Sequence, residues 1–279
     1  MNTLYISDLD GTLLNDNAEI SENDIRELNR LISNGLNFTA ASARTHVTII
    51  KILEKANIKL PVITMNGAAI YDLRKKKYTY AAILTDDAKK TLIDIIHSCI
   101  RAGFLYTIED GILHTYYETA KTPAAKAFIE ERERKYNKKF TQISSFEECI
   151  DKDIIYYSVA DKPENLQKPY DILKEHTDLH VDFYHDIYTE GCMYLEISSA
   201  KASKKNALLK LKKDFGFHRV VSFGDNLNDL PMFEVSDECY ATANAKQIVK
   251  EKATGIIGSN TDGGVIDFLK SNTEFTVPH

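Results

Sequence analysis

Residues 3–12 read TLYISDLDGT, and this stretch decides how the rest of the chain is interpreted. It begins with a short apolar run, Thr3 to Ser7, and continues into two acids and a glycine. Such a run ahead of polar residues is typical of a buried strand that leads into a functional loop. Because residues two apart in an extended segment project to the same side, Asp8 and Asp10 can share one pocket.

Two carboxylates this close together need a positive charge nearby. Neighbouring carboxylates repel each other unless a proton or a cation intervenes. Mg²⁺ is the natural cation, because it prefers oxygen ligands and is often held by one or two carboxylates together with phosphate oxygens. A second acidic loop, residues 224–229 (GDNLND), follows another apolar strand and supplies the further acid that such a site needs. Parallel sheets bind ligands beyond the carboxyl ends of their strands, which is where these loops lie.

The pattern around these loops predicts the fold class. Strands at 3–7, 36–41 and 61–65 alternate with helices at about 21–34 and 47–55. Simple alternation returns after residue 201, with a helix at 203–215 and a strand at 219–223. Such alternation indicates a parallel sheet with helices on both faces. We therefore predict an α/β protein with a Rossmann-like parallel-sheet core made of residues 1–81 and 189–279.

The middle of the chain has a different pattern. Between residues 82 and 188, expected helices alternate with short strand pieces, and Asp110-Gly111 favours a tight hairpin turn with positive φ. Hairpins together with helices predict an α+β domain inserted into the core, with two connections to it.

Composition narrows the class of protein. The 279 residues carry a formal net charge of −6, which argues against a nucleic-acid partner. No apolar run is long enough to span a bilayer and no signal peptide is visible, so no membrane partner is expected. The four cysteines are far apart in sequence, which favours reduced thiols over a zinc site. We expect a cytoplasmic protein.

With these motifs in place, the sequence resembles phosphatases of the haloacid dehalogenase (HAD) superfamily, and within it the Cof-like sugar-phosphatase group with a C2-type α/β cap. The family patterns DxDGT and GDxxND match at residues 8–12 and 224–229. The second family motif falls on residues 42–44 (SAR), with alanine in place of glycine, and the third on 204–208 (KKNAL), with a second lysine in place of glycine. Residues 66–68 (NGA) also resemble this group.

The resemblance implies a role for each matched position. Asp8 attacks phosphorus and forms an aspartyl-phosphate, and Asp10 protonates the leaving oxygen and later deprotonates water. Mg²⁺ is held by Asp8, Asp225 and the backbone carbonyl of Asp10, while Asp229 supports either the metal or the motif lysine. The residues expected to bind the phosphoryl group are Leu9, Ser42, Ala43, Lys204 and Asn228. Lys201 competes with Lys204 for the lysine role, but the Ala-Leu register favours Lys204.

The expected activity is thus Mg²⁺-dependent hydrolysis of small phosphorylated metabolites, sugar phosphates first among them, with residues 82–188 as the cap that sets specificity. A phosphomutase that uses the same aspartyl-phosphate and a non-catalytic ligand-binding protein remain alternatives. A dehalogenase is disfavoured by Asp10 and by the pair Gly11-Thr12. We expect a monomer or a weak homodimer. Other phosphomonoesters and phosphates of cofactors, such as pyridoxal phosphate, are alternative substrates.

Overall fold

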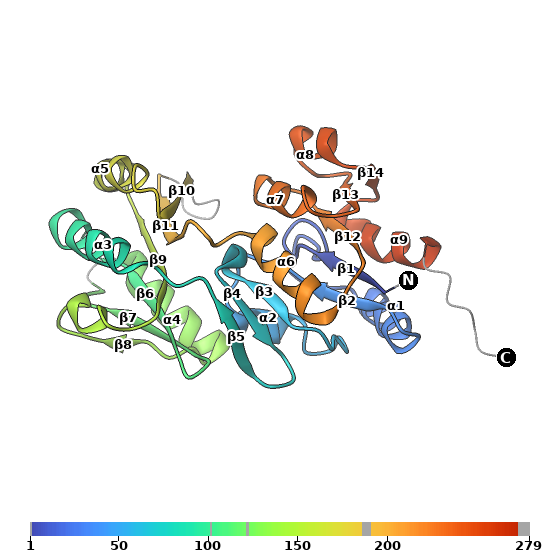
Figure 1. Ribbon diagram of the computed structural model, residues 1–279, viewed down its shortest axis with the longest axis horizontal. Helices are drawn as coiled ribbons and strands as arrows, with labels where there is room; N and C mark the ends of the chain where they lie inside the picture. The colour runs from blue at the N-terminus through green and yellow to red at the C-terminus, as the bar shows by residue number, and fades with distance from the viewer. Residues whose placement is uncertain (1, 101, 121–122, 186–190, 273–279) are drawn as a thin grey trace. The chain divides into compact units, whose positions relative to one another are not determined.

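The computed structural model describes residues 2–100, 102–120, 123–185 and 191–272 (Figure 1). The chain forms two compact units, residues 1–76 with 203–279 and residues 77–202. The sequence placed the ends of the insert at residues 82 and 188. The second of these positions lies outside the described residues. The strand that follows it pairs within the second unit, which therefore runs on to residue 202.

The first unit contains most of the alternating elements that the sequence predicts. Its strands are β1 (Thr3–Ser7), β2 (Asn37–Ala40), β3 (Val62–Thr64), β4 (Ala69–Asp72), β12 (Arg219–Gly224), β13 (Glu238–Thr242) and β14 (Gly255–Ile257). Its helices are α1 (Glu22–Ser33), α2 (His46–Ile52), α6 (Lys204–Phe215), α7 (Leu230–Phe233), α8 (Gln247–Lys252) and α9 (Gly264–Asn272). The expected cap of the first helix forms, since the Ser21 hydroxyl accepts a hydrogen bond from the Asp24 amide.

A parallel five-stranded sheet forms the centre of this unit, in the order β14-β13-β12-β1-β2. The strands β1 and β12 are neighbours, with Ser7 opposite Phe223, so the loops that follow them leave the same edge of the sheet. The predicted α/β core is confirmed. One detail differs, because the strand expected at 61–65 pairs antiparallel with β4 and joins β2 by a single bridge from Ile63 to Ala41.

The second unit is built on an antiparallel sheet. Its strands are β5 (Lys77–Ala81), β6 (Phe104–Glu109), β7 (Ile112–Tyr117), β8 (Thr141–Gln142), β9 (Ile154–Asp161), β10 (Leu179–His185) and β11 (Met193–Ser199), and its helices are α3 (Asp86–Cys99), α4 (Pro123–Tyr136) and α5 (Pro163–Leu173). The sheet order is β10-β11-β9-β6-β7-β8, antiparallel except between β7 and β8. The predicted hairpin is confirmed, because Asp110 and Gly111 both have positive φ between β6 and β7.

Side chains of the two sheet faces have different surroundings in the second unit. Leu105, Tyr157 and Leu195 lie on one face and pack with residues of α3 and α5 into a single apolar core. Their neighbours in the strands point to the opposite face, because side chains alternate along a strand. On that opposite face the Phe104 ring lies 4.9 Å from the ring of Phe128, a residue of α4.

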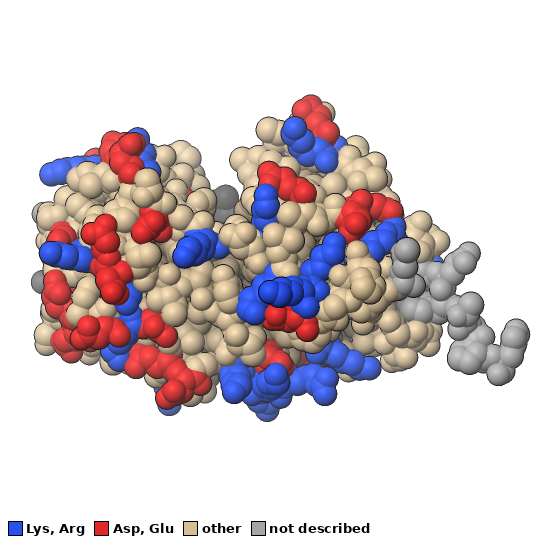
Figure 2. Space-filling model, viewed as in Figure 1, with Lys and Arg blue, Asp and Glu red and all other residues tan. Residues whose placement is uncertain are grey.

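Charged side chains are scattered over the surface of both units. Basic and acidic groups both occur over the face drawn in Figure 2. Several exposed charges form ion pairs, such as Lys210 with Asp214 at 2.8 Å, and pairs of this kind contribute little to stability. Among the described residues, no helix has the length and apolar character needed to cross a membrane.

Candidate active site

Asp8 lies directly after β1, at the edge of the parallel sheet. Its backbone N–H donates to the carbonyl oxygen of Phe223 in β12 at 3.0 Å, which continues the pairing of the two strands by one residue. Its side chain is buried. The first acid of the motif is therefore held on a rigid strand end rather than on a free loop, as the precise placement of a reacting group requires.

Lys204 brings the first acidic loop and the second one together. Its ammonium donates to Asp8 Oδ1 at 2.5 Å and to Asp229 Oδ1 at 2.7 Å, and its side chain is completely buried. The residue begins helix α6, whose N-cap Ser203 accepts a hydrogen bond from the Asn206 amide. A buried ammonium is tolerated only with such partners. Lys201, by contrast, is an exposed residue of the second unit.

Asp229 shapes the second acidic loop. Its Oδ2 accepts hydrogen bonds from the backbone amides of Asp225 and Asn226, at 2.9 and 3.1 Å. Its other oxygen receives Lys204. Asp229 thus contacts both the loop and the motif lysine.

Asp225 lies against the first acidic loop. The Thr12 hydroxyl donates to Asp225 Oδ1 at 3.0 Å. Gly11 has a φ of +76°, and a Cβ at this position would lie 2.5 Å from Asp225 Oδ2. Only glycine meets both conditions, since an L-residue is strained at this φ and has no room here. The DxDGT motif thus places its glycine and threonine where they hold the acid of the other loop.

Three carboxylates gather at this edge of the sheet. One oxygen from each of Asp8, Asp225 and Asp229 lies within 4.8 Å of the others. Burial raises the pKa of Asp8 well above its ordinary value; Lys204 counteracts this, and Asp229 and Asp225 add to it. Burial and the charge of Asp229 likewise raise the pKa of Asp225 to about 6.

The carboxylates of this cluster outnumber its ammonium group, and a proton or a further cation can offset the excess negative charge. Burial alone lowers the pKa of Lys204, but Asp229 and Asp8 raise it more, so the lysine stays charged. One ammonium faces three carboxylates. A divalent cation bound beside Asp8 and Asp225 would relieve the remaining repulsion, so the residues present fit a Mg²⁺ site.

Asp10 is not one of these three carboxylates, and it pairs with an arginine. Arg44 donates from Nε to Asp10 Oδ2 at 2.8 Å and from Nη2 to Asp10 Oδ1 at 2.6 Å. A bidentate pair of this kind fixes the plane of the carboxylate. The sequence identified Arg44 as part of a motif and gave it no role. Its position directly after Ser42-Ala43 was the available signal, but the partner lies 34 residues away.

The residues expected to bind phosphate are distributed around the same edge. Ser42 is buried just after β2, and its hydroxyl accepts a hydrogen bond from the Arg44 amide. Ala43 is exposed. The Leu9 side chain is buried, and its carbonyl oxygen accepts the amides of the following turn. Asn228 follows β12, and its amide nitrogen donates to Asn66 Oδ1 at 3.0 Å. The pairing with Asn66 is a contact that sequence reasoning missed.

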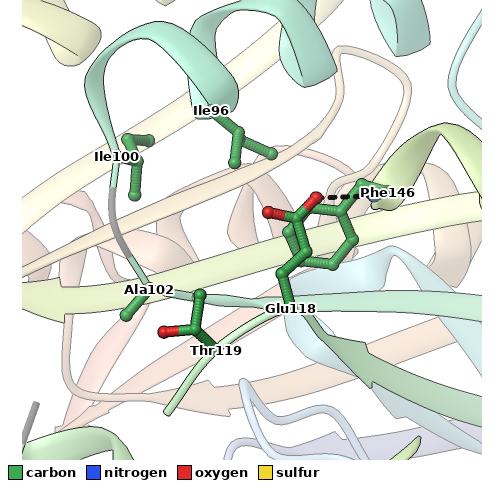
Figure 3. A pocket seen from close by; sticks show the side chains of 7 residues that line it. Ile96, Ile100, Ala102, Glu118, Thr119 and Phe146 are labelled. Carbon is green, nitrogen blue, oxygen red and sulfur yellow. Dashed lines mark hydrogen bonds between the residues drawn. The ribbon is translucent and has the colours of Figure 1, made fainter. Parts of the chain in front are cut away.

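The second unit contains a small cavity, which does not have the size of a substrate site. It is lined by residues from α3, from the segment between α3 and β6 and from the segment after β7, together with Phe146 (Figure 3). Its volume of about 10 Å³ has room for roughly one water molecule. Glu118 borders it and accepts the Phe146 amide at 2.6 Å. Thr119 Oγ1 has no hydrogen-bond partner among the described residues, which suits a single buried water.

Comparisons with known proteins agree with this geometry. Residues 5–269 match the haloacid dehalogenase-like hydrolase family. Phosphatase YwpJ of Bacillus subtilis is 27% identical, covering 96% of this chain and 98% of that protein. Pyridoxal phosphate phosphatase YbhA of Escherichia coli is 25% identical, over 95% and 96% of the two chains. The crystal structure of TM0651 from Thermotoga maritima superimposes with a TM-score of 0.79 at 29% identity, over 98% of both chains. This chain belongs to the haloacid dehalogenase-like hydrolase family, and it is a phosphatase.

Proposed function

We propose that this phosphatase hydrolyses phosphomonoesters of small metabolites, sugar phosphates first among them, through a phosphorylated Asp8 and with Mg²⁺. The observation that carries the proposal is the buried Asp8 at the end of β1, held 2.5 Å from the ammonium of Lys204. A carboxylate fixed beside a buried cation is well placed to act as a nucleophile towards a bound phosphoryl group.

In this proposal Asp8, Asp225 and the backbone carbonyl of Asp10 hold Mg²⁺. The metal ion would neutralise negative charge on the phosphoryl group and orient it. Asp229 supports the site from behind, because it already holds Lys204 and two backbone amides. Ser42, Ala43, Leu9, Lys204 and Asn228 would contact the phosphoryl oxygens.

In this proposal the hydrolysis takes place in two steps, formation and then hydrolysis of an aspartyl-phosphate. A carboxylate oxygen of Asp8 attacks phosphorus, and the bond from phosphorus to the leaving oxygen breaks. Protonated Asp10 gives its proton to that oxygen, so an alcohol departs. Water then attacks the phosphorus of the aspartyl-phosphate and loses its proton to Asp10, which releases phosphate and regenerates Asp8. Arg44, which donates a hydrogen bond to each oxygen of Asp10, holds this carboxyl group in one orientation.

Two variants test the division of labour between the neighbouring acids. We expect Asp8→Asn to abolish turnover of every substrate, because no phosphoenzyme forms. We expect Asp10→Asn to slow a sugar phosphate by ~10²–10⁴, because its leaving alkoxide needs a proton. With p-nitrophenyl phosphate the first step should suffer far less, and rapid mixing should show a burst of nitrophenolate followed by slow turnover. Equal losses on both substrates without a burst would contradict the role of Asp10.

The metal and the substrate need separate experiments. We expect chelation to abolish activity, Mg²⁺ to restore it and Ca²⁺ to inhibit, because calcium takes a larger and looser ligand shell. Full activity after exhaustive chelation would remove the metal from the mechanism. A panel of phosphorylated metabolites should include pyridoxal phosphate, the substrate that the name of YbhA gives. Released phosphate measured against isomerised sugar distinguishes a phosphatase of this kind from a phosphomutase.

A further inference from the structure

The turn that follows β3 has an unusual backbone. Met65, Asn66 and Gly67 have φ angles of +49°, +51° and +95°. Glycine adopts such angles freely and asparagine tolerates them, whereas methionine is disfavoured there. Strained residues of this kind persist only where their surroundings hold them, and they concentrate at functional sites.

The backbone of this turn is held by the second motif and by the start of α6. The amides of Met65 and Asn66 donate to the carbonyl oxygens of Arg44 and Ser42, each at 3.1 Å. On the other side, a Cβ placed on Gly67 would lie 2.1 Å from the carbonyl carbon and oxygen of Ser203. The turn is therefore packed between the segment that follows β2 and Ser203, the residue that precedes Lys204.

The side chain of the same turn reaches the second acidic loop. Asn66 Oδ1 accepts the hydrogen bond from Asn228 Nδ2 at 3.0 Å, across 162 residues of sequence. The contact fixes which way the Asn228 amide is turned. One three-residue turn thus touches the neighbourhoods of Ser42, Lys204 and Asn228, which are three of the groups that the proposed function assigns to phosphate binding.

We propose that Asn66 is a positioning residue for the phosphoryl group, which it serves through Asn228. The inference rests on the proposed function, because that function places Asn228 at the phosphate. A purely structural role would need only a backbone that accepts positive φ, and glycine meets that need better than asparagine. Unlike asparagine, a glycine at position 66 could not make the hydrogen bond to Asn228.

Three variants separate the side chain from the backbone. Asn66→Gly keeps a backbone suited to the turn and removes the contact to Asn228. Asn66→Ala removes the same contact and also strains the backbone. Ala18→Gly is the matched control, because Ala18 has a φ of +57° in a turn of the same unit that takes no part in the site. Each purified full-length variant is assayed for hydrolysis of p-nitrophenyl phosphate, for binding of inorganic phosphate by calorimetry with Mg²⁺, and for its thermal midpoint.

We expect Asn66→Gly and Asn66→Ala to lose kcat/KM and phosphate affinity alike, by roughly tenfold for one lost hydrogen bond. Asn66→Ala, which also strains the backbone, should lower the thermal midpoint more than Asn66→Gly, and Ala18→Gly should change neither activity nor affinity. If Asn66→Gly matches the wild type in both activity and affinity, the turn is structural and the inference is wrong.

A double-mutant cycle then tests the route through Asn228. The double variant Asn66→Gly with Asn228→Ala should bind phosphate no more weakly than Asn228→Ala alone, because Asn66 acts only through that amide. Additive losses would overturn the inference. Failure of the proposed function is distinguishable, since a wild type that binds phosphate and releases none from any ester would contradict that function while the affinities still test Asn66.

Discussion

The two units bury ionisable side chains in opposite ways. In the first unit, Lys204 is enclosed between Asp8 and Asp229, so buried charge meets buried charge. In the second unit, the sheet face opposite α3 and α5 carries what we call the tyrosine face, made of Tyr106, Tyr156, Tyr184, Tyr194 and Glu196. There the Glu196 carboxyl hydrogen-bonds the hydroxyls of Tyr156 and Tyr184, and burial raises its pKa to about 7. The partners of this acid are neutral hydroxyl groups, and burial makes Glu196 hold its proton to a higher pH than an exposed glutamate does.

The same contrast extends to the lysines. Lys204 stays charged because two carboxylates touch it. Lys138 is also buried, but its ammonium lies over the rings of Tyr106 and Phe140, at 4.5 and 4.9 Å, and burial lowers its pKa to about 7. The comparison teaches that burial alone does not predict the protonation state of a side chain. The partner decides whether an ionisable group keeps its charge inside the protein.

The largest effect should come from breaking the charged cluster. We expect Lys204→Met to abolish activity and to reduce the free energy of unfolding by about 3–5 kcal/mol, because it leaves Asp8 and Asp229 buried without their cation. Urea denaturation with Mg²⁺ absent measures the change. Lys205→Met is the matched control on the same helix, since Lys205 is partly exposed and pairs with Glu234 at 2.9 Å. It should cost less than about 1 kcal/mol. Similar losses in both variants would contradict a special role for the buried lysine.

This contrast also explains how far the sequence could be read. The α/β core, the HAD family and the phosphatase class are confirmed. They could be predicted because each rests on apolar runs that lead into contiguous motifs. The pairing of β3 with β4 was missed, since an apolar run does not reveal the direction of its neighbour. The pairs Arg44–Asp10 and Asn66–Asn228 join distant positions, and no local pattern marks them.

The tyrosine face was beyond prediction for a related reason. Its residues come from four strands, and Glu196 meets its neighbours only because the register sets it opposite Asp182 on one side and Ser158 on the other. The sequence showed many tyrosines in the insert, and it could not show which of them share a face. A one-residue slip in any strand would have turned its side chains to the other side of the sheet.

A smaller effect should come from the acid of the tyrosine face, as a dependence on pH. The folded protein keeps the proton of Glu196 up to about pH 7, whereas the unfolded chain releases it near the ordinary value of 4.5. Its contribution is therefore fully present below about pH 4.5 and is lost as the pH rises to 7. We expect the free energy of unfolding to fall by roughly 2 kcal/mol over this range. This is somewhat less than the full shift of the Glu196 pKa implies, because the side chain is only partly buried.

Glu196→Gln isolates this contribution, because glutamine stays neutral. Free energies of unfolding from urea titrations at pH 5 and pH 8 should differ more in the wild type than in the variant. All other titrating groups, Asp225 included, are shared by the two proteins and cancel in the comparison. The exposed Glu164 provides the control, and Glu164→Gln should leave the wild-type dependence intact. If Glu196→Gln keeps the full dependence, the carboxyl is ionised in the folded protein and the contrast between the two units fails.

The smallest expected effect comes from removing the Tyr156 hydroxyl, one of the neutral partners of Glu196. The hydrogen bond from Tyr156 lowers the pKa of Glu196 and so acts against burial. Removing it in Tyr156→Phe should raise that pKa above about 7 and cost about 1 kcal/mol of stability for the lost bond. Tyr157→Phe is a close control, since its hydroxyl donates to the Ala102 carbonyl at 3.3 Å from the other face of the sheet. NMR titration of ¹³C-labelled glutamate should show the Glu196 carboxyl shifted upwards in Tyr156→Phe alone. If the pKa of Glu196 is unchanged or lower in Tyr156→Phe, the tyrosine does not stabilise the ionised carboxyl. If Tyr157→Phe raises that pKa equally, a general loosening of the sheet, and not the hydrogen bond from Tyr156, sets the protonation of Glu196.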